Sequence, residues 1–101
     1  MKYQVRWLKL AAEELQNIRE YLDREAPYQA QEVVRFIYDN AMTLTSFPNG
    51  RGQREPDWPE YRRLVVLKTY KVFYKVIESN KTVEICHTRH TSQGYFNPYE
   101  D

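Results

Sequence analysis

The feature that most constrains the fold is a change in the spacing of apolar residues near the start of the chain. Residues 2–8 alternate between apolar and polar side chains, which is the pattern of a half-buried strand. From residue 8 onward, the apolar residues recur every three or four positions, which predicts an amphipathic helix. These residues are Leu8, Ala11, Leu15, Ile18 and Leu22. A strand followed at once by a helix indicates a domain in which helices cover a sheet.

A second helix is predicted directly after the first. Pro27 suits the first turn of a helix, and the helical spacing of apolar residues continues as far as Leu44. Residues 47–50, with the sequence FPNG, are a stop signal. Because the connection between the two helices is so short, we expect them to pack as an antiparallel hairpin.

The second half of the chain is predicted to form strands. Residues 51–59 contain two prolines and no periodicity, which is typical of a surface loop. Strands are then expected at residues 61–67, 70–78 and 82–90, joined by links short enough for hairpins. The predicted fold is therefore α+β: a strand, an antiparallel helical hairpin, and a three-stranded antiparallel meander, with the helices packed on one sheet face. We expect a single domain over residues 1–93 and a C-terminal tail over residues 94–101.

Composition and charge exclude several classes of protein. A chain of 101 residues has room for one core, and its single cysteine excludes an internal disulfide framework. No apolar run approaches the roughly 18 residues of a membrane span, so we expect a cytoplasmic protein without membrane contact. Residues 51–93 carry nine Lys and Arg against five Asp and Glu. This surplus could attract a polyanion or an acidic protein segment, or it could simply keep strand edges soluble.

Five segments, in their order and spacing, resemble the RelE/ParE superfamily of bacterial toxins, and His90 after the last strand extends the similarity. The segments are residues 3–7 (YQVRW), 11–22 (AAEELQNIREYL), 47–51 (FPNGR), 61–66 (YRRLVV) and 70–76 (YKVFYKV). The resemblance implies a toxin of a type II toxin–antitoxin pair, as in plasmid stabilisation systems, that is neutralised by a cognate antitoxin. It also implies no cofactor, and contact with operator DNA only through the antitoxin.

The superfamily that the chain resembles contains two mechanisms. RelE-like members cut messenger RNA at the ribosome without a metal, whereas ParE-like members inhibit DNA gyrase. The resemblance matches two basic positions of the RelE-like site to Arg62 and Lys71. A third basic position falls on Leu64, and the basic residue after the last strand falls on the uncharged residues 91–93. Because half of this set is missing, we expect a ParE-like gyrase inhibitor; the alternative is a ribosome-dependent mRNA endoribonuclease.

Candidate functional residues follow from these two alternatives. If the chain is an endoribonuclease, the catalytic candidates are Arg62, Lys71, Arg89 and His90. His90 is the best candidate for an acid or base, because imidazole titrates near neutral pH. Contact with the target or the antitoxin is expected from Trp58, Arg62, Arg63 and Arg89.

Each candidate also has a purely structural interpretation. Arg62 could pair with a helix carboxylate or stack on a tyrosine, and it must point to the opposite sheet face from Arg63. Trp58 could be a lid over the sheet, and the segment of Arg89 and His90 could be a solvated strand end. The antitoxin itself is expected on the helical hairpin or along an open sheet edge.

The string Cys86-His87-x-x-His90 contains residue types that bind metals. On a regular strand, Cys86 and His87 point to opposite faces, as do His87 and His90. A structural zinc site also needs four ligands. We therefore predict no metal site and expect Cys86 to be a small core residue.

Overall fold

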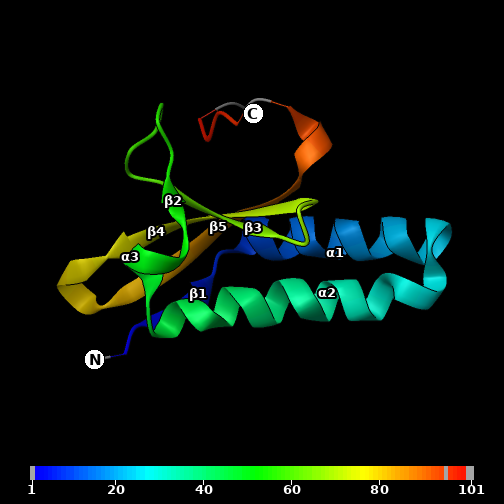
Figure 1. Cartoon of the computed structure of the whole chain (residues 1–101), viewed down its shortest axis with the longest axis horizontal. Coiled ribbons are helices and arrows are strands. Elements are labelled where there is room, and N and C mark those ends of the chain that lie inside the picture. Colours follow the sequence, from blue (N-terminus) through cyan, green and yellow to red (C-terminus); the bar gives the residue numbers. More distant parts are fainter. Residues whose placement is uncertain (1, 95, 100–101) are drawn as a thin grey trace.

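The computed structural model describes residues 2–94 and 96–99, with two long helices against one face of a five-stranded sheet (Figure 1). The elements are β1 (Gln4–Trp7), α1 (Lys9–Glu25), α2 (Pro27–Met42), α3 (Pro48–Arg51), β2 (Gln53–Arg54), β3 (Arg62–Val66), β4 (Tyr70–Ile77) and β5 (Thr82–His90). Single turns of 3₁₀ helix are η1 (Thr43–Thr45), η2 (Glu78–Asn80) and η3 (Thr91–Gln93). The predicted α+β fold is confirmed.

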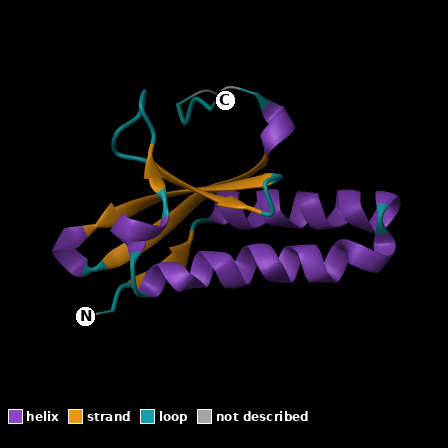
Figure 2. Cartoon of the chain, viewed as in Figure 1, coloured by secondary structure: helices purple, strands orange, loops and turns teal. Residues whose placement is uncertain are grey.

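The strand order in the sheet is β1-β5-β4-β3-β2. Figure 2 shows the strands in orange beside the two long helices in purple. Strands β3, β4 and β5 form the expected antiparallel meander, and β1 lies parallel to β5 at one edge. The prediction of a surface loop over residues 51–59 is wrong in part, since Gln53 and Arg54 pair with Arg63 and Arg62 at the other edge. A two-residue strand is too short to produce a periodicity that the sequence could reveal.

The core lies between the helical hairpin and the sheet. Ala11 on α1 and Ala41 on α2 are fully buried, and these small side chains allow both helices to approach the strands closely. Ile37 and Leu44 pack against the sheet residues of the same core cluster. Figure 1 shows that the hairpin is longer than the sheet, so its far half projects past the strand ends. No helix in the described part of the chain is both long and apolar enough to cross a membrane.

A β-bulge interrupts the pairing of β4 with β5. Phe73 pairs with His87 and Tyr74 pairs with Ile85, so that Cys86 is the extra residue. As a result, Cys86 and His87 lie on the same side of the sheet, where Cys86 joins a cluster with Phe96 and the His87 ring lies 5.3 Å from the Phe96 ring. The expectation that they point to opposite faces is wrong, because it assumed a regular strand.

The turn between β3 and β4 lies one residue earlier than predicted. Its central residues are Leu67 and Lys68, with φ of 56° and 60°. The N–H of Thr69 donates to the Val66 carbonyl oxygen at 3.2 Å, which closes the turn. Two central residues with positive φ are the mark of a type I′ turn, whose twist matches that of the strands that it joins.

Residues 96–99 lie against the sheet face that the helices leave open. The Phe96 ring stacks on the Phe73 ring with a centroid distance of 3.7 Å and an interplanar angle of 8°. The indole N–H of Trp58 donates to the Phe96 carbonyl oxygen at 3.0 Å. These residues fall within the segment 94–101 that was expected to be a tail; residues 95, 100 and 101 of that segment lie outside the described residues.

Candidate functional site

The sheet has two faces with different surroundings, and every candidate residue on a strand belongs to one of them. The inner face is covered by the helices and carries Tyr70, Val72 and Tyr74 of β4. The outer face is opposite, and its described residues on β3, β4 and β5 are Arg63, Val65, Lys71, Phe73, Lys75, Ile77, Thr82, Glu84, Cys86, His87 and Arg89. Residues paired across neighbouring strands point to the same face, so the strand register assigns each side chain.

The four nuclease candidates are divided between these two faces. Lys71 pairs with Arg89 on the outer face. Arg62 pairs with Tyr74, and His90 pairs with Tyr70; both tyrosine rings belong to the core cluster beneath the helices. Of the four candidates, the structure therefore brings together Lys71 and Arg89.

Arg62 attaches the connection between α3 and β2 to the inner margin of the sheet. Its Nη2 donates to the carbonyl oxygens of Asn49 at 2.5 Å and Gly52 at 3.3 Å. The partners are backbone carbonyls, whereas the sequence suggested a helix carboxylate or a tyrosine ring. The Tyr74 hydroxyl donates to the Pro48 carbonyl oxygen at 2.7 Å in the same region, and burial raises the pKa of this phenol. These contacts give Arg62 a structural role.

Gly52 has to be glycine because the chain passes so close to the sheet at this point. A methyl group added at Gly52 would overlap the Tyr74 hydroxyl oxygen and would lie 2.6 Å from the Arg63 carbonyl oxygen. Its backbone is in the extended region, so the requirement is one of space.

Arg63 points to the outer face, as the alternation of β3 requires once Arg62 is on the inner face. Its Nη1 lies 2.9 Å from Glu55 Oε2, and its Nη2 donates to Gln53 Oε1 at 3.3 Å. Glu55 is buried, so this ion pair compensates the charge of Arg63 and fixes β2 to β3. Arg63 is therefore held by its own chain.

Trp58 is half-buried and behaves as a lid over the outer face. Besides its hydrogen bond to the Phe96 carbonyl, its ring meets the Tyr99 ring edge-on at 5.2 Å. The Tyr99 hydroxyl donates to a carboxylate oxygen of Glu60, which lowers the pKa of that carboxyl. The aromatic lid is defined as Trp58, Tyr61, Phe73, Phe96 and Tyr99.

A row of basic side chains lies beside the aromatic lid. The Arg89 guanidinium lies 6.0 Å from the centre of the Phe96 ring, and the Lys75 ammonium lies 4.7 Å from the centre of the Tyr61 ring. Lys71 is directly opposite Arg89 in the register. We call Lys71, Lys75 and Arg89 the basic strip. Sequence analysis did not name Lys75 as a candidate. Its position four residues after Lys71 on the same strand places it on the same sheet face.

His90 caps the single turn η3 at the end of β5. Its Nδ1 accepts hydrogen bonds from the Ser92 backbone N–H at 3.0 Å and from the Ser92 hydroxyl at 2.7 Å. The backbone N–H of His90 donates to Gln93 Oε1 at 2.6 Å. Its ring meets the Tyr70 ring edge-on at 5.4 Å. Because Nδ1 accepts, the imidazole proton is assigned to Nε2. The strand end is thus ordered by its own side chains.

Cys86 is buried among residues of the aromatic lid. Burial raises the pKa of its thiol to about 11, so the thiol is protonated at neutral pH and is a poor nucleophile. His87, its neighbour, lies with Nδ1 at 3.4 Å from Glu14 Oε1 on α1. His87 shares the outer face with Lys71 and Arg89, a proximity that sequence reasoning missed because nothing in the sequence marks the bulge. No group of three or more His, Cys, Asp or Glu side chains is arranged to hold a metal within the described ranges.

Comparisons with known proteins agree with this architecture. In the chromosomal ParDE toxin–antitoxin system from P. aeruginosa, one chain superposes with a TM-score of 0.77 at 20% identity, covering 87% of this chain and 95% of that one. The toxin–antitoxin complex RelBE2 from Mycobacterium tuberculosis gives 0.63 at 21% identity, with 89% and 99% covered. A free mutant of the E. coli toxin RelE gives 0.66 at 13% identity, with 87% and 82% covered. At these identities the likeness shows the fold.

The family is shown by the sequence itself. No curated protein matches the chain at a significant level. The model of the ParE toxin of the type II toxin–antitoxin system parDE, however, matches residues 5–95, from β1 to beyond η3. The chain therefore belongs to the ParE toxin family and is the toxin of a type II toxin–antitoxin system.

Proposed function

We propose that this toxin acts by binding and inhibiting DNA gyrase. The observation that carries the proposal is the division of the candidate cations between two sheet faces, in a chain of the ParE family. Cleavage of RNA without a metal needs a base, an acid and cations gathered around one phosphate. The register assigns Arg62 and His90 to the inner face and Lys71 and Arg89 to the outer face, so the sheet lies between the two pairs. Inhibition by binding requires no such convergence.

The hydrogen bonds that His90 makes within its own chain support the same proposal. A general base needs a free ring nitrogen at the substrate, whereas His90 Nδ1 already accepts two hydrogen bonds from Ser92. Its ring meets the Tyr70 ring edge-on, on the inner face of the sheet. The role of His90 is then to order the end of β5.

A cognate antitoxin is the proposed second partner. The P. aeruginosa and M. tuberculosis structures both come from toxin–antitoxin pairs, which supports the same arrangement for this chain. Strand β3 pairs with β4 on one side, and on the other side only its residues Arg62 and Arg63 are paired, with β2. The rest of that edge has no strand neighbour among the described residues. Val65 and Leu67, exposed at 50% and 47%, lie along that edge, which suits an added strand. We propose that the toxin works in the cytoplasm and reaches operator DNA only through the antitoxin.

A ribosome-dependent mRNA endoribonuclease is the second candidate. The observation in its favour is that Lys71, Arg89 and His87 share the outer face, where two cations and an imidazole could meet a phosphate. His87 Nδ1, however, lies against Glu14, and the aromatic lid stands over the neighbouring part of this face.

Two assays of the purified toxin separate these candidates. DNA gyrase with relaxed plasmid reports supercoiling, and a translating extract reports the integrity of messenger RNA. We expect loss of supercoiling with intact RNA, and the variant His90→Ala should inhibit gyrase nearly as well as the parent. Ribosome-dependent cuts with unaffected supercoiling would instead support the nuclease. In that case Lys71→Ala should abolish the cuts, while Lys68→Ala, the same change in the exposed turn, should not.

A further inference from the structure

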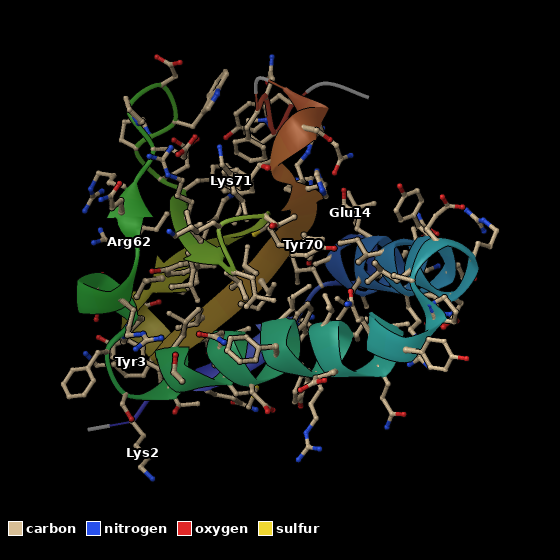
Figure 3. All side chains as sticks on the ribbon, turned by 45° about the vertical axis from the view of Figure 1, so that its right-hand side comes forward. Lys2, Tyr3, Glu14, Arg62, Tyr70 and Lys71 are labelled. Atoms are coloured by element: carbon tan, nitrogen blue, oxygen red, sulfur yellow. The ribbon has the colours of Figure 1, made fainter. Side chains whose placement is uncertain are left out.

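A pocket of about 490 Å³ opens where the helical hairpin projects past the end of the sheet. Helix α1 contributes Glu14, Ile18 and Tyr21 to its wall, and the sheet contributes Tyr70 and His90. Figure 3 shows Glu14 and Tyr70 facing the same space between α1 and the strand ends. A pocket of this size is within the range that holds a small ligand or a large side chain.

The carboxylate of Glu14 is fixed in this pocket by the edge of β5. Strand β1 ends at Trp7, opposite Ile85, so the rest of β5 has no strand neighbour on that side within the described residues. The N–H of Thr88 donates instead to Glu14 Oε1 at 3.0 Å. The Thr88 hydroxyl donates to the Ala11 carbonyl oxygen at 3.4 Å and ties α1 to the same place. The carboxylate is thus held on a rigid part of the fold.

The pocket has one charged wall group and aromatic sides. Among its described lining residues, Glu14 is the only Asp, Glu, Lys or Arg. The His90 Nδ1 accepts from the Ser92 backbone N–H, and on the outer-face side His87 Nδ1 lies 3.4 Å from Glu14 Oε1. Glu14 Oε2 accepts no hydrogen bond from the described residues, and its side chain is 24% exposed. A negative charge beside the rings of Tyr21 and Tyr70 attracts a cation, because aromatic faces are also negative.

We infer that this pocket receives an arginine side chain of the antitoxin. The guanidinium would donate to Glu14 Oε2, and its planar face and aliphatic stem would lie along Ile18 and the two tyrosine rings. Arginine is favoured over lysine because its delocalised, weakly hydrated cation stacks on aromatic rings and pairs with carboxylates in a fixed geometry. A phosphate, in contrast, would meet the charge of Glu14, so the pocket does not suit RNA. The identity of the partner as an antitoxin rests on the proposed function.

A titration of the full 101-residue chain by nuclear magnetic resonance tests this inference. The probes are N-acetylarginine amide and N-acetylcitrulline amide, which have nearly the same shape but differ in charge. We expect the arginine probe to shift the amide signals of Glu14, Tyr21, Thr88 and His90 saturably, and to bind at least about tenfold more tightly than the citrulline probe. That ratio corresponds to about 1.4 kcal/mol, at the lower end for a hydrogen bond to a charged group.

The variant Glu14→Gln isolates the charge. Its amide oxygen can still accept from Thr88 N–H, so the fold is kept, but the preference for the arginine probe over the citrulline probe should disappear. Glu13→Gln makes the same change on an exposed position of α1 that does not line the pocket, and it should bind like the parent.

Three results would overturn the inference: equal binding of both probes, arginine-induced shifts confined to other surfaces, or an unchanged preference in Glu14→Gln. Saturable shifts of the same signals by adenosine monophosphate would also contradict it, in favour of a nucleotide. Gyrase inhibition is measured separately on the unmodified chain. A failure of the proposed function therefore leaves the titration interpretable, and a failure of the titration leaves gyrase inhibition standing.

Discussion

Truncation of Phe96 to alanine tests whether the C-terminal segment is part of the folded core. The Phe96 side chain is 5% exposed, and Phe73 covers one of its faces. A buried phenylalanine removes about 150–250 Å² from water, which at about 25 cal/mol per Å² is worth about 4–6 kcal/mol as an upper bound. Residues 96–99 can also detach after truncation and regain about 1–2 kcal/mol of backbone entropy per residue, which limits the loss. We expect Phe96→Ala to lower the free energy of unfolding by about 2–3 kcal/mol.

Urea denaturation followed by circular dichroism measures this loss directly. For a chain of this size the same change lowers Tm by about 10–20 °C. The control is Phe47→Ala, because Phe47 is 69% exposed and should change the free energy of unfolding by less than about 0.5 kcal/mol. If the two variants were equally stable, residues 96–99 would contribute nothing to the fold, and the reasoning from the Phe73 stack would be refuted.

Three further predictions concern the scaffold. Gly52→Ala should cost about 1–3 kcal/mol of unfolding free energy in urea denaturation, because its methyl group overlaps the Tyr74 hydroxyl; an unchanged midpoint would contradict this. Replacing Leu67-Lys68 by Asn-Gly should raise Tm by several degrees, since Asn and Gly adopt positive φ more readily, whereas a lower Tm would count against the type I′ turn. Hydrogen bonds from Asn49, Tyr3 and Lys81 lower the pKa of Glu78 from about 4.5 to about 2. Its stabilisation should therefore be complete above about pH 4.5 and be lost as pH falls toward 2; Glu78→Gln should reduce this acid dependence in denaturation series at several pH values, and an unchanged dependence would exclude the role of Glu78.

Most of the fold follows from patterns within single elements. The alternation in residues 2–8 and the helical spacing up to Leu44 predict β1 and the hairpin, because each element buries a face whose period is local to the sequence. The strand β2 could not be found this way, since its two residues are specified by their pairing with β3 and not by any repeat.

The site residues were harder to predict because each depends on which face a strand position occupies. The sequence did contain one usable signal: Arg62 has the same parity as Leu64 and Val66, which are buried on the inner face. That parity assigns Arg62 to the inner face and Arg63 to the outer face, and the predicted opposition of the two arginines is confirmed. No comparable signal exists for Arg89, whose direction is set by the bulge.

The extra residue at Cys86 has a consequence for how relatives of this toxin are compared. Counted from Val83 and Ile85 without the bulge, Arg89 would point toward the helices, and His90 would point away from them. A relative without this extra residue would keep the later residues of β5 on the same faces, but each would stand one position earlier in the sequence. If a chain with the extra residue is aligned without a gap to one that lacks it, outer-face positions of one are matched with inner-face positions of the other. A functional role transferred between the two chains in this part of β5 would then be assigned to the neighbouring residue.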